Sequence, residues 1–133
     1  MGLAEQIASW SKDPSTKCGA VLVRPDLTIA SVGFNGFPRG VNDDISRLNN
    51  RDIKLQYTVH AELNCILSAK TKETGCCLFV WPMQPCASCA AAIVQYGIAT
   101  VYSPKNEPKG WEDSFKISRK ILSEGNVRLV RKT

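Results

Sequence analysis

One histidine, two cysteines and one glutamate stand in an order that suits a catalytic metal ion. His60 is the only histidine among the 133 residues, and Glu62 follows two positions later. Further along the chain, Cys86 and Cys89 come directly after Pro85. An imidazole and two thiolates are ligands that Zn²⁺ prefers, and three protein ligands leave the fourth tetrahedral position open for water. The pattern therefore predicts one catalytic zinc ion per chain.

Glu62 is left free of the metal by this assignment, and its type and position suit proton transfer. Zinc lowers the pKa of a coordinated water to about 7. A carboxylate two residues from a metal ligand can reach both that water and a substrate bound beside it. We therefore expect Glu62 to be the catalytic acid–base residue.

Two predicted helices must bring these ligands together. Cys86 and Cys89 lie on one face at the start of one helix, where the positive end of the helix dipole favours the thiolate form. His60 lies near the start of a second helix, for which Thr58 is the expected N-cap. The two helix N-termini are therefore expected to converge on one cation.

The rest of the chain alternates strands and helices, which predicts a layered α/β domain with a mixed sheet over residues 1–133. The first two strands form a hairpin across Arg24-Pro25-Asp26. Residues 35–56 are polar and are expected to form a loop that serves as a lid or binding loop. We expect strands at residues 19–23, 28–34, 76–81, 98–102 and 127–130, and helices at residues 3–10, 59–70, 86–96 and 113–123.

Composition and charge favour a soluble protein of a reducing compartment. Hydrophobic residues make up 44% and charged residues 22% of the chain, which is ordinary for a globular domain. No apolar run approaches the roughly 20 residues of a membrane span, and the start lacks the pattern of a secretory signal. We therefore expect a cytoplasmic protein with reduced thiols. The net charge of +5 favours an anionic partner, although the basic C-terminal third is also typical of a solvated face.

Three other interpretations of the metal motif remain open. A structural zinc site needs a fourth protein ligand, and the chain has four cysteines outside the motif. These are Cys18, Cys65, Cys76 and Cys77. A thioredoxin-like redox pair would leave the histidine and the glutamate unused. A non-catalytic, zinc-stabilised nucleic-acid-binding domain would show interleaved aromatic and basic residues on a sheet face, but aromatics are only 8% here.

The combined H-x-E and P-C-x-x-C pattern is the signature of zinc-dependent nucleobase deaminases. Three longer stretches extend the likeness over nearly the whole chain. They are Ser11-Lys12-Asp13-Pro14 with Lys17-Cys18-Gly19-Ala20-Val21, Gly33-Phe34-Asn35-Gly36-Phe37-Pro38-Arg39-Gly40 with Asn42-Asp43-Asp44, and His60-Ala61-Glu62-Leu63-Asn64. On these residues the chain resembles the deoxycytidylate (dCMP) deaminases of the cytidine deaminase superfamily. The resemblance implies a three-layer α/β/α fold with a central mixed sheet of about five strands.

The resemblance implies hydrolytic deamination of dCMP to dUMP with release of ammonia, within pyrimidine deoxyribonucleotide synthesis. It implies the zinc and proton-transfer roles given above, and a hydrogen bond from Asn35 to the sugar. Lys17 is the candidate for the 5′-phosphate, with a solvated lysine at the start of a strand as the alternative. Ala61 and Trp111 are further substrate-binding candidates, and simple packing is the alternative for Trp111. Within the same chemistry, another cytosine or guanine compound is the alternative substrate.

The resemblance also implies regulation and assembly. The family commonly forms hexamers, is activated by dCTP and is inhibited by dTTP with Mg²⁺. A homo-hexamer with a second nucleotide site is therefore expected, with Arg39, Asn42 and Asp43 as candidates for that site by their position. No membrane or nucleic-acid partner is expected. The lack of further histidines argues against a second zinc ion.

Overall fold

The computed structural model describes residues 1–132, and a five-stranded mixed sheet forms its centre. The strands are β1 (Gly19–Val23), β2 (Ile29–Phe34), β3 (Cys77–Trp81), β4 (Thr100–Pro104) and β5 (Arg128–Lys132). Their order across the sheet is β2-β1-β3-β4-β5. β1 pairs antiparallel with β2 and β3, and β4 and β5 continue the sheet in parallel. The predicted hairpin and the predicted mixed sheet are confirmed.

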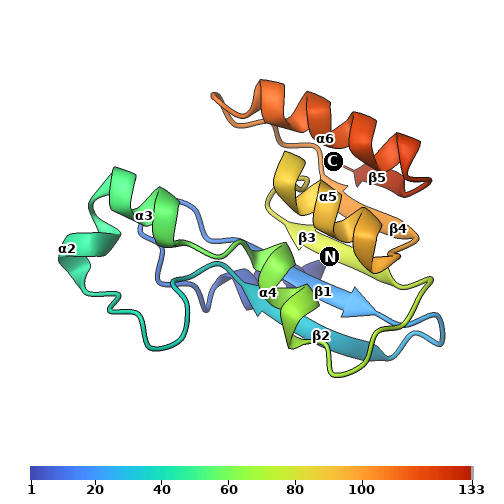
Figure 1. Cartoon of the computed structure of the whole chain (residues 1–133), viewed down its shortest axis with the longest axis horizontal. Helices are drawn as coiled ribbons and strands as arrows, with labels where there is room; N and C mark the ends of the chain where they lie inside the picture. Colours follow the sequence, from blue (N-terminus) through green and yellow to red (C-terminus); the bar gives the residue numbers. More distant parts are fainter. Residues whose placement is uncertain (133) are drawn as a thin grey trace.

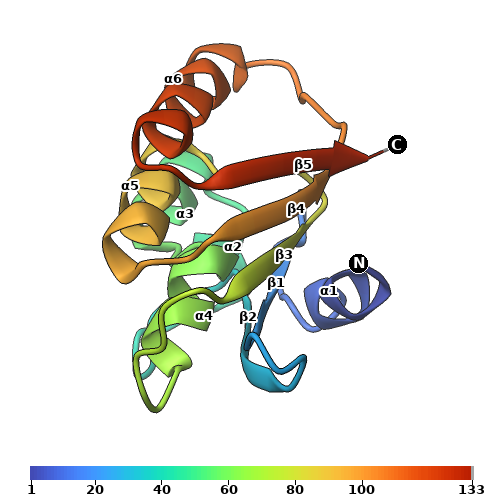
Figure 2. The ribbon, with the colours of Figure 1, turned by 90° about the vertical axis from the view of Figure 1, so that its right-hand side faces the viewer.

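Helices cover both faces of this sheet. They are α1 (Gly2–Ala8), α2 (Ile45–Leu48), α3 (Arg51–Tyr57), α4 (Ala61–Ser68), α5 (Ala87–Tyr96) and α6 (Glu112–Glu124). Figure 2 shows α1 on one face and α4, α5 and α6 on the other, which is the expected three-layer α/β/α arrangement. The helices α2 and α3 lie beyond one end of the sheet (Figure 1). Among the described residues, no helix is long and apolar enough to cross a membrane.

Both faces of the sheet are buried, and successive residues of a strand contribute to opposite faces, because their side chains point to opposite sides of the sheet. Ala20 and Leu22 of β1 belong to the main core with buried residues of α4, α5 and α6. Val21 between them packs with Ala4 and Ile7 of α1 on the other face. Burying an aliphatic side chain of this size contributes about 1.5 to 3 kcal/mol. The core therefore fixes α4 and α5, and with them the starts of both helices.

Two glycines let helices approach the sheet closely. A Cβ atom at Gly33 in β2 would overlap backbone atoms of Ala61 and Cys65 in α4. A Cβ atom at Gly19 in β1 would overlap the backbone of α1. The contact at Gly33 sets the distance between β2 and the first turn of α4, which carries Glu62.

The long polar segment predicted as a loop contains two short helices, and this part of the prediction is wrong. α2 begins after Asp44, whose carboxylate accepts a hydrogen bond from the Arg47 amide at 3.1 Å. α3 begins after Asn50, whose side chain accepts from the Ile53 amide at 3.2 Å. Such caps stabilise a helix start by about 1 kcal/mol. The only buried residue in either helix is Lys54, so no apolar periodicity announces them.

The helix α4 begins later than predicted. Thr58 is the C-cap of α3, and its hydroxyl donates to the Lys54 carbonyl at 2.6 Å. His60 is the N-cap residue of α4. The predicted N-cap role of Thr58 is therefore wrong, because its hydroxyl already serves the preceding helix.

Candidate active site

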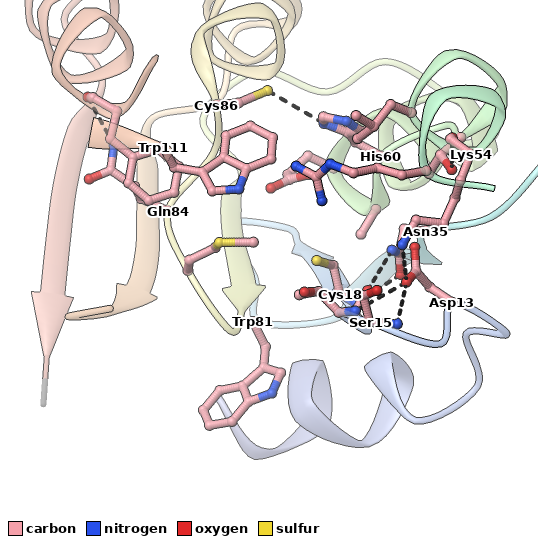
Figure 3. Close-up of a pocket in the computed structure, with 18 residues that line it drawn as sticks. Asp13, Ser15, Cys18, Asn35, Lys54, His60, Trp81, Gln84, Cys86 and Trp111 are labelled. Carbon is pink, nitrogen blue, oxygen red and sulfur yellow. Dashed lines mark hydrogen bonds and ion pairs between the residues drawn. The ribbon is translucent and has the colours of Figure 1, made fainter. Parts of the chain in front are cut away.

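The three predicted metal ligands meet where two helices begin (Figure 3). His60 precedes the first turn of α4, and Cys86 is the N-cap residue of α5. Nδ1 of His60 lies 3.4 Å from the sulfur of Cys86 and 3.4 Å from the sulfur of Cys89. The predicted convergence of two helix N-termini is confirmed.

The donor set and its spacing fit zinc. With Zn–N near 2.05 Å and Zn–S near 2.3 Å, tetrahedral geometry places nitrogen and sulfur roughly 3.6 Å apart. The observed separations of 3.4 Å are close to that value. Within residues 1–132, the cluster contains no fourth histidine, cysteine, aspartate or glutamate. A tetrahedral ion would therefore keep one position for water, and a structural site closed by a fourth cysteine is not what these residues form.

Hydrogen bonding couples the three side chains electrostatically. The pKa of Cys86 is lowered to about 3, chiefly because the Cys89 thiol donates a hydrogen bond to it. The same hydrogen bond, together with burial, raises the pKa of Cys89. The hydrogen bond with Cys86 also raises the pKa of His60. Thiolate character is thus concentrated at Cys86. A bound divalent cation would also displace the proton of Cys89, because both sulfur ligands must be deprotonated.

Glu62 lies beside the cluster without belonging to it. The residue is 8% exposed and lines the same cavity as His60 and Cys86. Its burial raises the pKa of the carboxyl group. A buried carboxyl group that faces a cavity next to an open metal position is placed to hold or release a proton there. This placement fits the role predicted for Glu62.

A cavity of about 140 Å³ opens next to these groups. Its lining comes from the segment after α1, the end of β2, and from α3, α4 and the residues around the starts of α5 and α6. In Figure 3, Trp111 and Gln84 lie on one side of the cavity, and Asp13, Asn35 and Lys54 lie on the other. A ligand in this cavity would contact elements that are far apart in the sequence.

The predicted sugar-binding residue Asn35 lies in the cavity wall and also holds the neighbouring loop. Its Oδ1 accepts from the Cys18 amide at 2.8 Å, and its Nδ2 donates to the Thr16 carbonyl at 2.9 Å. A side-chain amide has a second N–H and a second lone pair on its oxygen. Asn35 can therefore fix residues 16–18 and still offer one N–H to a ligand.

The other three substrate-binding candidates differ in position. Ala61 and Trp111 line the cavity, and the Trp111 ring stacks on Phe115 with centroids 6.0 Å apart. Lys17 is exposed and is not among the lining residues. Ala61 and Trp111 therefore lie at the active-site cavity, and Lys17 lies outside its lining.

The candidate regulatory residues lie outside the cavity lining. Arg39 and Asn42 are exposed, and the Asn42 amide donates to Asp44 at 3.3 Å. Asp43 forms an exposed ion pair with Lys12 at 3.0 Å. The structure thus places these residues on a surface segment and leaves their regulatory role a prediction.

Sequence reasoning missed three charged residues of the cavity. Asp13 Oδ1 accepts from the backbone amides of Ser15 and Thr16 at 2.8 and 3.1 Å. It also accepts from Lys54 Nζ at 2.9 Å, in an ion pair whose side chains are each 10% exposed. Arg51 lines the cavity one helical turn before Lys54. Arg51 and Lys54 are three residues apart, which places them on one face of a helix. This spacing could have indicated a basic face only if α3 had been predicted as a helix.

Comparison with known proteins agrees with this geometry. The family model described as the cytidine and deoxycytidylate deaminase zinc-binding region matches residues 1–104. The chain is 42% identical over 131 residues to the "uncharacterized deaminase in luxG 3′ region" of Aliivibrio fischeri, covering 96% of this chain and 87% of that protein. It is 38% identical over 128 residues to a probable deoxycytidylate deaminase of Caenorhabditis elegans, covering 94% of this chain.

The chain spans 64% of the length of the nematode protein, which is less than two thirds. Among solved structures, it is similar to the dCMP deaminase of the cyanophage S-TIM5, crystallised with dCMP and dUMP. The TM-score is 0.77 at 24% identity, covering 98% of this chain and 91% of the phage chain. At this identity the likeness shows that the two proteins share a fold.

Proposed function

The chain belongs to the cytidine and deoxycytidylate deaminase family, and from this premise we propose that it hydrolyses dCMP to dUMP and ammonia. The observation that carries the proposal is the cluster of His60, Cys86 and Cys89, with the carboxyl group of Glu62 beside it in one cavity. Relatives named deoxycytidylate deaminases support dCMP as the substrate.

The protein's contribution to the chemistry is proton transfer and orientation. Zinc held by the three ligands would supply an acidified water that is nucleophilic at neutral pH. Glu62 accepts the proton released when water adds to C4 of the cytosine ring, and passes it to N3. The second proton comes from the hydroxyl now on C4, and Glu62 passes it to the exocyclic amine. The C4–N bond then breaks, ammonia leaves, and C4 keeps the oxygen as a carbonyl. One water is consumed and one ammonia is formed, so atoms and charge balance.

Neighbouring residues hold the substrate in this scheme. The free N–H of Asn35 donates to a sugar hydroxyl. Ala61 is the first residue of α4, and its backbone N–H has no partner within the helix, so it is available to the base. Trp111 packs against the base edge and shields the reacting carbon from bulk water. These three roles match the positions of the residues in the cavity lining.

The direct test is ammonia release by zinc-loaded protein from dCMP, deoxycytidine and guanine at equal concentrations. We expect dCMP to be turned over fastest. Faster turnover of deoxycytidine or guanine would show that the substrate is another cytosine or guanine compound and not dCMP. A zinc-loaded, folded protein that releases ammonia from no cytosine or guanine compound contradicts the proposal.

We further propose regulation of this activity by nucleotides, on the basis of the resemblance. In this proposal dCTP activates and dTTP with Mg²⁺ inhibits a homo-hexamer, at a second site around Arg39, Asn42 and Asp43. The exposure of Arg39 and Asn42 outside the active-site cavity supports this position. A cytoplasmic location is likewise a prediction, made from the sequence.

A further inference from the structure

Two cations line the active-site cavity, and they differ in their surroundings. Lys54 is paired with Asp13 at 2.9 Å and is almost fully buried. Arg51 is exposed at the cavity wall. Among residues 1–132, no carboxylate lies within salt-bridge distance of Arg51, and its side chain forms no hydrogen bond. Arg51 is therefore a cation at the substrate cavity that lacks an anionic partner within the described chain.

The Lys54–Asp13 pair fixes the position of Arg51. Arg51 and Lys54 are three residues apart on α3 and so lie on the same face of that helix. Lys54 is the only buried residue of α3. Its partner Asp13 is itself held by the amides of Ser15 and Thr16. Figure 3 shows Lys54 reaching toward Asp13 on the wall opposite Trp111. The ion pair thus attaches α3 to the loop after α1 and keeps Arg51 at the cavity.

The groups around this ion pair suit an oxyanion. Ser15 and Thr16 line the cavity, and their hydroxyl groups form no hydrogen bond within the described residues. Hydroxyl groups donate readily to phosphate oxygens. The guanidinium of arginine binds phosphate with two parallel N–H donors, which gives geometric specificity as well as charge. The side of the cavity formed by α3 and residues 13–16 therefore offers the donors that a phosphate group requires.

We infer that Arg51 binds the 5′-phosphate of the substrate, and that Lys54 and Asp13 are positioning residues that hold Arg51 at the cavity. The inference rests on the proposed function, because it takes a nucleoside monophosphate as the substrate. It assigns the phosphate to α3 in place of Lys17, which is exposed and outside the lining. It also makes α3 the element that distinguishes nucleotides from nucleosides.

The first test compares kcat/KM for dCMP and deoxycytidine in Arg51→Gln. A charge-assisted hydrogen bond of ordinary strength predicts a loss of roughly 10- to 150-fold on dCMP. Deoxycytidine has no phosphate, so its kcat/KM should change by less than about 2-fold. Arg128→Gln is the matched control, because it removes the same charge from an exposed position on β5 outside the cavity. Equal losses on both substrates, or no loss on dCMP, would overturn the inference. So would a selective loss in Lys17→Ala that Arg51→Gln does not show.

The second test measures binding without turnover, using dUMP and deoxyuridine in a calorimeter. The unmodified protein should bind dUMP more tightly, and Arg51→Gln should abolish most of that preference. Lys54→Met should reduce the preference and Lys54→Arg should restore part of it, which a purely structural role would not produce. A protein that binds dUMP through Arg51 but releases no ammonia from dCMP would refute the proposed function and leave this inference standing. An unmodified protein that binds both ligands equally would refute the inference.

Discussion

The metal-binding end of the active site, formed by the starts of α4 and α5, and the α2–α3 segment are held by different forces. Both regions reach the cavity, the second through residues of α3. α4 and α5 pack on the sheet through fully buried residues such as Cys65, Ala90 and Ile93. α2 buries no residue, α3 buries only Lys54, and both lie beyond the end of the sheet (Figure 1). Apolar burial holds the first region. The second is held by hydrogen-bonded caps, the Lys54–Asp13 ion pair and the contacts of the Tyr57 ring with Phe37 and Arg47.

This difference separates the chemistry from the selection of substrate. Groups that act on reacting atoms need rigid support, which the core provides to His60, Cys86 and Glu62. A segment with few apolar contacts opens at low cost, and binding segments are commonly of this kind. We therefore expect substitutions at the metal-binding end to abolish the reaction, and substitutions at the cavity-lining residues of α3 to change which ligand is bound.

The largest effect is expected from Cys86→Ala, which removes one of three metal ligands. Zinc content should fall well below one per chain, and turnover of dCMP should fall by more than roughly 10⁴-fold, beyond the usual contribution of one acid–base group. Metal analysis and ammonia release on the same sample check this. A variant that retains a full zinc complement would mean that another residue completes the site.

Gly33→Ala tests the rigid support of the metal-binding end. The added methyl group overlaps backbone atoms of Ala61 and Cys65, so α4 must shift. Overpacking of this kind costs about 1 to 3 kcal/mol in the free energy of unfolding, measured in urea. Gly36→Ala is the control, because a Cβ atom there meets nothing within 4 Å. Equal stability of the two variants would show that α4 is not held tightly against β2.

Lys54→Met tests whether the second region opens independently. We expect the free energy of unfolding of the whole protein to fall by less than about 1 kcal/mol, because α3 can detach without disturbing the sheet. Amide hydrogen exchange over residues 51–58 should nevertheless become faster. A loss of global stability as large as that of Gly33→Ala would show that α3 belongs to the same cooperative unit as the core.

The smallest effect on basal activity is expected from Asp43→Ala. The Lys12–Asp43 pair is exposed at both ends and contributes about 0 to 1 kcal/mol. Basal kcat/KM for dCMP should stay within about 2-fold, since no chemical step uses this carboxylate. Sigmoidal kinetics that respond to dTTP–Mg²⁺ and dCTP should be blunted, because a regulator must favour one of two states. If the unmodified protein shows hyperbolic kinetics that neither nucleotide changes, the proposed regulatory site is contradicted.

The metal-binding end could be predicted from the sequence better than the α2–α3 segment. The convergence of His60, Cys86 and Cys89 and the helix ended by Gly97 were predicted correctly, because ligand types and a left-handed cap leave clear local signals. The strands β1 and β3 were visible as apolar runs. β4 begins two residues after its predicted start, and β5 contains three charged residues. The helices of the α2–α3 segment were not predicted, because they are short and stabilised by polar caps at Asp44 and Asn50. The partnership of Asp13 with Lys54 joins residues far apart in the chain, and no local pattern announces it.

Glu62→Gln gives the most direct test of the central claim, that a metal site held by three ligands works with a separate carboxyl group. Glutamine keeps the shape of the side chain but cannot carry the proton. Single-turnover deamination of dCMP should fall by roughly 10²- to 10⁴-fold. Zinc measured on the same sample should remain near one per chain, since Glu62 lies outside the ligand cluster. Near-normal turnover, or loss of the zinc, would contradict the account.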